Sequence, residues 1–229
     1  MPVDGVALFW PVATIGIYWG ARALNQHLAR WWTSPLLLTW GACLGLALAL
    51  HASYGEYIRG THWIMALLGP ATVAFAMPIY ERRAVIRRHW PTLLAGVAVG
   101  SAIAVGSGWG LATLLNLSPA LRLSLLPRSV TTPFALAFSS DIGGIPELTA
   151  TCVVITGLFG AAFGEILLKV LPLSSSFARG ALFGMGAHGA GVAKAREVGR
   201  EEGTVAGLVM VLAGLASVGI GPLLALWLR

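Results

Sequence analysis

Charged residues are scarce in this chain of 229 residues. They make up 10% of the sequence, whereas hydrophobic residues make up 57% and the mean hydropathy is +0.80. A soluble domain carries roughly 25% charged residues because its surface has to face water. The shortage therefore excludes an ordinary soluble protein and indicates a single integral membrane domain over residues 1–229.

Cysteine is also scarce, since only Cys43 and Cys152 occur and they lie far apart within apolar runs. This spacing argues against a disulfide framework and a thiolate metal site, and we expect both side chains to pack in the core. The first residues lack the basic stretch of a signal peptide, so we expect the first apolar run to be retained as a span. No motif indicates a hydrolase, a nucleotide-binding loop or a metal site, and we expect neither an enzyme nor a bound cofactor.

Apolar runs close to membrane-spanning length repeat along the whole chain. A helix needs about 20 residues to cross roughly 30 Å of hydrocarbon. The sequence predicts an all-α transmembrane bundle of about seven spans, near residues 6–21, 33–51, 63–80, 91–115, 146–170, 177–195 and 204–228. Small residues four apart favour close helix packing, as in Gly16/Gly20, Gly41/Gly45, Gly96/Gly100, Gly160/Gly164 and Gly180/Gly184.

The basic residues gather between the predicted spans, which favours membrane orientation over nucleic-acid binding as the reason for the net charge of +6. Arginine is frequent in the first and third connections, at Arg22, Arg30, Arg82, Arg83, Arg87 and Arg88, whereas the second holds only Glu56 and Arg59. The positive-inside rule then places the N-terminus outside. Tryptophans at span ends are typical of a membrane-anchoring belt, namely Trp31, Trp32, Trp63, Trp90 and Trp227.

Two apolar segments are interrupted by helix breakers. Residues 121–145 contain Pro127, Pro133, Gly143 and Gly144 and are followed by Pro146; residues 67–78 contain Pro70, Thr72 and Pro78. The first segment predicts half-helices or a re-entrant loop, and non-helical backbone at membrane depth survives only inside protein or beside a wet cavity. Paired broken helices are typical of secondary transporters, and an inverted repeat is a further hypothesis.

The segment Pro127–Pro133 has the composition of an anion-binding site. Thr132 suits a helix N-cap and Pro133 the first helical position, so a half-helix would begin there with free amides and the positive end of its dipole. Ser129, Thr131 and Thr132 add hydroxyl donors and Arg128 adds a positive charge, which favours a bound carboxylate. The alternative is that Arg128 extends to an interface and the hydroxyls bond backbone carbonyls.

His188 is the histidine that lies well inside a predicted span, within a run that also contains Gly184, Gly186, Gly189 and Gly191. Glycines at this density weaken a helix, and an unwound turn would expose carbonyls and amides to a ligand. An intramembrane histidine indicates a functional site because its polarity is costly there. It would bind a carboxylate or relay a proton; the alternative is a hydrogen bond to a neighbouring helix.

Acidic residues near the second break are candidates for proton or cation coupling. Asp141 precedes Gly143 and Gly144, and Glu147 follows Pro146 at the predicted start of a helix, where its charge favours the dipole. The alternative is that both are solvated loop or cap residues. Glu165 and Lys169, four residues apart, are expected to pair with each other.

The chain resembles the LrgB/CidB family of bacterial membrane proteins over nearly its whole length. The resemblance is carried by LLGPATVAFAMPIY (67–80), PRSVTTPFA (127–135), IGGIPELTA (142–150), VITGLFGAAFG (154–164) and ARGALFGMGAHGAGVAKAREVG (178–199). The family's usual lysine is replaced by Arg128, which keeps the charge with a different geometry. Ala187 stands where a serine usually precedes the histidine, so a hydroxyl beside His188 is missing.

The resemblance implies two kinds of function. One is a carrier of small 2-oxo or 2-hydroxy monocarboxylates such as pyruvate, glycolate and glycerate; the other is an antiholin-like regulator of murein hydrolase export and autolysis. It also implies a bacterial inner-membrane location, a small LrgA/CidA-type membrane partner and a homo-oligomer. Because a pore needs no anion-binding site, the broken helices favour an alternating-access carrier that holds substrate at Arg128, Ser129, Thr131, Thr132, His188 and Gly189.

Overall fold

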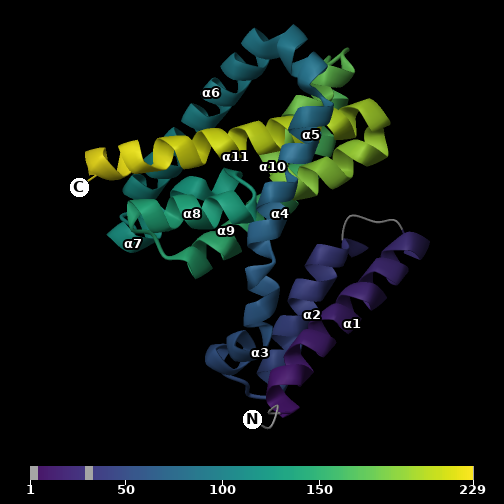
Figure 1. The fold of residues 1–229 in the computed structure, drawn as a ribbon, viewed down its shortest axis with the longest axis vertical. Helices are drawn as coiled ribbons and strands as arrows, with labels where there is room; N and C mark the ends of the chain where they lie inside the picture. Colours follow the sequence, from purple (N-terminus) through teal and green to yellow (C-terminus); the bar gives the residue numbers. More distant parts are fainter. Residues whose placement is uncertain (1–4, 29–32, 229) are drawn as a thin grey trace. The chain divides into compact units, whose positions relative to one another are not determined.

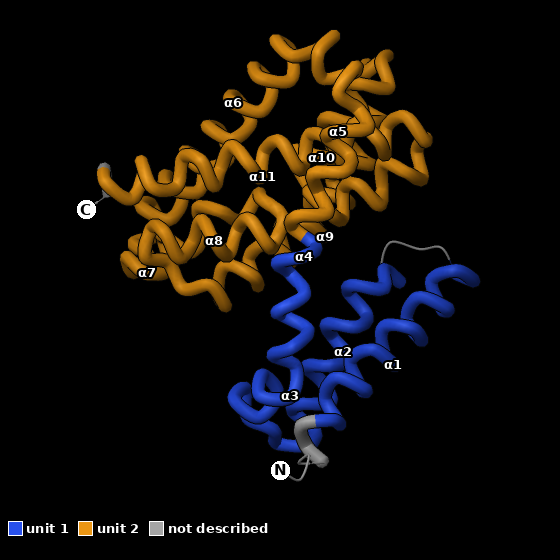
Figure 2. Tube along the Cα trace, viewed as in Figure 1, with its two compact units in different colours: residues 1–71 blue, residues 72–229 orange. Residues whose placement is uncertain are grey.

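Helices form all the regular structure in the described part of the chain (Figure 1). The computed structural model describes residues 5–28 and 33–228, with side chains over 8–28 and 33–226, so Arg30, Trp31, Trp32 and the side chain of Trp227 lie outside the described residues. The expected all-α class is confirmed. Two compact units make up the chain, residues 1–71 and residues 72–229 (Figure 2).

The first unit contains α1 (Gly5–Leu28), α2 (Pro35–Ala49) and α3 (Tyr54–Ala66). Trp10 is buried and packs edge-on against Tyr57 at 5.3 Å between ring centroids, and Thr14 shares a 3.2 Å hydrogen bond with the Tyr57 hydroxyl. At the start of α3, Ser53 and Glu56 form a reciprocal capping box.

Proline divides the helical stretch from residue 54 to residue 81. After α3 come α4 (Leu68–Ala74) and α5 (Ala76–Glu81). Proline lacks the N–H that would bond the carbonyl four residues earlier. The carbonyl of Ala66, where α3 ends, therefore receives no hydrogen bond from position 70. The carbonyl of Ala74, where α4 ends, receives none from position 78. Pro70 and Thr72 both lie inside α4, and their role as broken-helix positions stays a prediction.

The second unit is built on long helices that run beside short ones. They are α6 (Arg83–Leu114), α7 (Pro119–Leu125), the 3-10 helix η2 (Leu126–Ser129), α8 (Thr132–Ile142), α9 (Pro146–Val170), α10 (Ser176–Val198) and α11 (Arg200–Leu228). Helix α6 is kinked at His89, whose φ of −117° and ψ of 19° are not helical. Pro91, two residues further on, accounts for the kink.

Helix α10 reverses direction at His188, and we call residues 176–198 hairpin B. Positions eight apart in a straight α-helix are separated by about 12 Å along the axis. A Cβ on Gly191 would nevertheless collide with the carbonyl oxygen of Phe183, so the second half of α10 folds back on the first. The reversal occurs at His188, where φ is 37° and ψ is −121°.

Within the second unit, hairpin B runs along α9, starting from the C-terminal end of that helix. Its tip, His188, fits against Gly157, where a Cβ would lie 2.5 Å from the imidazole. Its returning half places Lys194 in a 3.0 Å ion pair with Glu165, eight residues further along α9. The predicted span at residues 177–195 is therefore not confirmed, because this segment goes in and comes back.

A second reversal, residues 119–142, approaches α9 from its other end, and we call it hairpin A. Its two arms meet at Thr149, whose hydroxyl donates to the backbone oxygen of Ser124 at 3.0 Å and shares a 2.7 Å hydrogen bond with the Ser139 hydroxyl. Between the arms, Val130 packs in one buried cluster with Val153, further along α9. Two short helices, α7 and α8, lie where the segment 121–145 was predicted to be broken, and their depth in a membrane stays a prediction.

The break inside hairpin A is held by fully buried polar groups. Ser124, Ser139 and Thr149 are each 0% exposed, and the Ser124 hydroxyl also accepts the N–H of Ile145 at 2.8 Å. Gly143 closes α8 at a φ of 82°, a conformation that glycine adopts without strain. These bonds satisfy backbone groups that would otherwise be costly inside a membrane.

Four helical stretches in the described residues have the length and composition of membrane spans: Tyr54–Glu81, Arg83–Leu114, Pro146–Val170 and Arg200–Leu226. The seven predicted spans are not confirmed. Helix α2 has 15 residues and reaches only about 22 Å at 1.5 Å per residue, and α10 is a hairpin. The length and composition of these apolar helices indicate a membrane protein. The outward orientation of the N-terminus stays a prediction.

The polar cluster of hairpin A is expected to contribute measurable stability. Thr149→Val keeps the shape of the side chain but removes hydrogen bonds to both arms, which should lower the free energy of unfolding by about 1–2 kcal/mol. Thermal unfolding in detergent measures the loss. Thr151→Val on the same helix is the control, because the exposed Thr151 hydroxyl bonds only its own helix at Glu147. Equal melting temperatures for the two variants would contradict this role.

Candidate functional site

The tips of hairpins A and B meet beside the same stretch of α9. Val130 of hairpin A packs with Val153, and the His188 ring of hairpin B lies beside the Val153 backbone and against Gly157. These α9 positions are 7 and 11 residues beyond Pro146, or about 10–17 Å into the helix. The sequence-predicted segments around Arg128 and His188 are therefore brought together well inside a membrane span.

The His188 side chain is placed for binding but lacks a full set of partners. It is 6% exposed, and its Nε2 atom is buried without a hydrogen-bond partner in the described chain. A non-glycine residue with positive φ is also strained, and such strain gathers at functional sites. In a neutral imidazole one ring nitrogen donates and the other accepts, so the unpartnered Nε2 is open to a ligand group of either kind.

Arg128 lies against α6 at the tip of hairpin A. Its Nη1 donates to the carbonyl oxygens of Ala104 at 3.2 Å and Leu125 at 3.4 Å, and its Nη2 donates to the Ser107 hydroxyl at 3.2 Å. Gly108 makes room for the guanidinium, since a Cβ there would collide with it. Guanidinium has five N–H donors, so the Nε–H and one Nη2–H remain without a partner in the described chain.

Cys152 of α9 lies between the two tips. Its side chain is near Arg128, and its chain neighbour Val153 lies beside His188. Cys152 is half-buried and free. The sequence offered no signal for this position, because a lone cysteine in an apolar run is typical of a core residue.

The predicted hydroxyl donors lie at the start of α8. Ser129, Thr131 and Thr132 are each half-buried, and within the described residues none of their hydroxyls makes a hydrogen bond. The N-cap is Thr131, one residue before the predicted Thr132, because the N–H groups of Phe134 and Ala135 both bond the Thr131 carbonyl. Pro133 therefore occupies the second helical position.

The candidate coupling residues lie away from the tips. Asp141, near the end of α8, is exposed and faces Gly221 of α11, where a Cβ would be 3.3 Å from its carboxylate. Glu147 is exposed in the first turn of α9, directly after Pro146 as predicted. Neither makes a hydrogen bond or ion pair with Arg128 or His188, so their coupling role stays a prediction.

Glycines near the tip of hairpin B divide into two kinds. Gly186 and Gly189, two of the predicted site positions, have nothing within 4 Å of where a Cβ would stand. Gly160 faces them differently, because a Cβ there would collide with the Gly186 carbonyl oxygen. Gly186 and Gly189 leave open space beside His188, whereas Gly160 allows the backbones of α9 and hairpin B to touch.

Ion pairs fix the base of hairpin B. Arg179 pairs with buried Glu202 of α11 at 2.7 Å, and Lys194 bridges Glu165 and Glu197 at 3.0 and 2.8 Å. Glu165 also lies 3.9 Å from Lys169, so the predicted pairing is present but is longer than the bond to Lys194. The sequence did not reveal the pairs between helices, since they depend on the reversal at His188.

The fold and the site define a polytopic α-helical membrane protein in which two helical hairpins meet inside the helix bundle. The chain belongs to the LrgB-like family, whose model matches residues 14–227. It is 39% identical over 211 residues to the uncharacterized protein YwbG of Bacillus subtilis, covering 92% of this chain and 94% of that one. It is 33% identical over 223 residues to the uncharacterized protein YxaC of the same organism, with 97% and 96% covered. No solved structure matches the chain.

The close contact between His188 and Gly157 is expected to leave no room for a methyl group at position 157. Gly157→Ala should displace the imidazole and lower the free energy of unfolding by about 1–3 kcal/mol. Gly106→Ala on α6 is the control, since nothing lies within 4 Å of its Cβ position and alanine favours a helix over glycine. Thermal unfolding of both variants in detergent tests the contrast. A Gly157→Ala protein as stable as Gly106→Ala would contradict the close contact.

Proposed function

We propose that this protein is a secondary carrier of small 2-oxo and 2-hydroxy monocarboxylates, of the pyruvate, glycolate and glycerate class. It works in the bacterial inner membrane by alternating access, together with an LrgA/CidA-type subunit and as a homo-oligomer. The observation that carries the proposal is the meeting of hairpins A and B at Val153, with Arg128 on one tip and His188 on the other. Carriers with broken helices bind their substrates where such breaks meet.

The unpaired donors at the tips suit one carboxylate. Arg128 supplies the positive charge and two free N–H groups, and charge-assisted hydrogen bonds to a carboxylate are the strong ones. Ser129, Thr131 and Thr132 supply hydroxyls that are not bonded within the described chain. Within the described residues, Arg128 is the cation at the two tips, and a single positive charge favours a monocarboxylate over a dicarboxylate.

His188 would recognise the oxygen next to the carboxylate. A neutral imidazole whose Nε2 accepts a hydrogen bond matches the hydroxyl of glycolate or glycerate. The 2-oxo group of pyruvate only accepts, so it cannot donate to that nitrogen. We expect 2-hydroxy acids to be preferred over pyruvate.

Alternating access would involve the hairpins rather than long-helix bending. Each tip covers the site from one end of α9, so movement of hairpin A opens one side and joint movement of hairpin B and α11 opens the other. Asp141 and Glu147 remain candidate coupling groups near the base of hairpin A, where water reaches them. The open space at Gly186 and Gly189 would receive the substrate.

Uptake of labelled glycolate, glycerate and pyruvate into proteoliposomes tests the proposal, with and without the LrgA/CidA-type partner. Arg128→Ala and His188→Ala should abolish saturable uptake, because each removes a substrate contact. Removing a buried contact to a charged group costs about 2–4 kcal/mol, or roughly 30- to 1,000-fold in apparent affinity. Arg128→Lys should retain part of the activity, since the charge stays while the fork geometry is lost.

Matched controls separate loss of binding from loss of folding. Lys169→Ala removes an exposed cation from the end of α9, and His62→Ala removes an exposed histidine from α3. Both should transport like the unaltered protein. If no substrate enters under any proton gradient while the protein is folded, the carrier proposal fails and the antiholin-like regulator of murein hydrolase export becomes the better assignment.

A further inference from the structure

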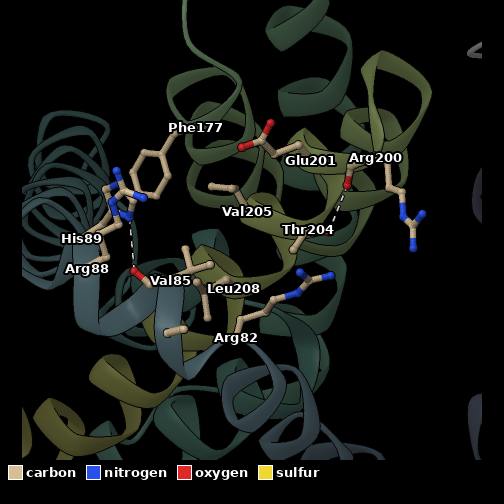
Figure 3. A pocket seen from close by; sticks show the side chains of 11 residues that line it. Arg82, Val85, Arg88, His89, Phe177, Arg200, Glu201, Thr204, Val205 and Leu208 are labelled. Carbon is tan, nitrogen blue, oxygen red and sulfur yellow. Dashed lines mark hydrogen bonds between the residues drawn. The ribbon is translucent and has the colours of Figure 1, made fainter.

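A cavity of about 680 Å³ lies in the second unit, away from the hairpin tips (Figure 3). It is formed where α5 gives way to α6 and where α10 and α11 begin, and none of the predicted site residues lines it. Its volume falls within the range of small-molecule sites, roughly 300–1,000 Å³. The cavity is therefore expected to bind a ligand other than the transported substrate.

The rim of the cavity carries excess positive charge. Arg82, Arg88 and Arg200 line it together with one carboxylate, Glu201. Figure 3 shows Arg88 beside His89 and Phe177, with Arg82 and Arg200 further to the right. Within the described residues, no side-chain hydrogen bond or ion pair engages any of the three guanidinium groups, so their N–H donors are available to an anion.

The floor of the cavity is apolar. Val205 and Leu208 of α11 are 4% and 1% exposed and belong to the buried cluster that also holds Leu93 of α6. Phe177 closes one side and stacks on His89 at 5.1 Å between ring centroids. The kink at His89 directs the first turns of α6 over the start of α11. A charged rim above an apolar floor suits a molecule with an anionic head and a hydrocarbon body.

The cavity also lies where a membrane surface would be. Arg82 separates the candidate spans Tyr54–Glu81 and Arg83–Leu114, and Arg200 begins the span Arg200–Leu226. Span ends rich in arginine face the cytoplasmic leaflet, whose anionic lipids attract basic residues. Basic pockets between transmembrane helices on this side are suited to phosphate head groups.

From these observations we infer that the cavity binds the phosphodiester head group of an anionic phospholipid. Arg82, Arg88 and Arg200 surround the anionic head group with positive charge, and Val205, Leu208 and Phe177 contact the glycerol backbone and the first acyl carbons. The bound lipid joins α6, hairpin B and α11 at their common end. This inference does not depend on the carrier proposal, since none of the transport residues takes part.

Lipid binding to the purified full-length protein in detergent tests the inference. Native mass spectrometry would count bound phosphatidylglycerol and phosphatidylcholine, with inorganic phosphate as a third probe. Phosphatidylglycerol should bind in a 1:1 ratio and more tightly than phosphatidylcholine, whose choline cation offsets the phosphate charge and is repelled by the arginines. Arg88→Gln and Arg200→Gln should each weaken phosphatidylglycerol binding by about fivefold, the effect of one arginine contact near a membrane surface.

Arg87→Gln is the matched control, because it removes the same charge from the adjacent, exposed position outside the cavity. It should leave the apparent dissociation constant within twofold of the unaltered value. If Arg87→Gln weakens binding as much as Arg88→Gln, general surface charge attracts the lipid and the cavity site is overturned. Displacement of phosphatidylglycerol by inorganic phosphate at equal concentration would also overturn it, in favour of a soluble phosphate ligand.

Discussion

Backbone contact at glycine is the constraint on which the second unit depends. The first half of α10 touches α11 at Gly180 and Gly184, where a Cβ would collide with the backbone of Glu202 and Ala206. On its other side, hairpin B touches α9 at Gly160. Lipid is as apolar as a leucine side chain, so helices in a membrane associate through close packing and polar bonds rather than through exclusion of water. These contacts set where the tip of hairpin B stops, and hence where His188 lies.

The two hairpins solve the problem of broken backbone at membrane depth in different ways. Hairpin A bonds Ser124, Ser139 and Thr149 to one another, whereas the hydroxyls at its tip have no partner within the described residues and the Nε of Arg122, in its first arm, is buried without one. Hairpin B turns at His188, whose Nε2 is also buried without a partner in the described chain.

Sequence reasoning identified the helical class and pointed to the two segments that form the tips. Pro70 and Pro78 predicted interruptions of the apolar run because a missing N–H acts locally, whereas Gly143 was predicted as a helix breaker and not as a C-cap. The reversal at His188 was missed, since an unwound turn and a full reversal leave the same glycine-rich pattern. The ion pair between Lys194 and Glu165 was missed with it. Glycine spacing was informative at Gly160 and Gly164 but not at Gly16 and Gly20, where nothing lies within 4 Å, because spacing does not say which face meets a neighbour.

The register of hairpin B on α11 also limits how the protein moves. If α10 slid along α11 by one residue, Phe183 or Met185 would replace Gly184 opposite the Ala206 carbonyl, and neither side chain fits that space. A piston-like stroke of this helix is thus sterically blocked. The first half of α10 and α11 therefore move as one rigid body. Any movement within the protein must occur at helix contacts that lack such close glycine packing.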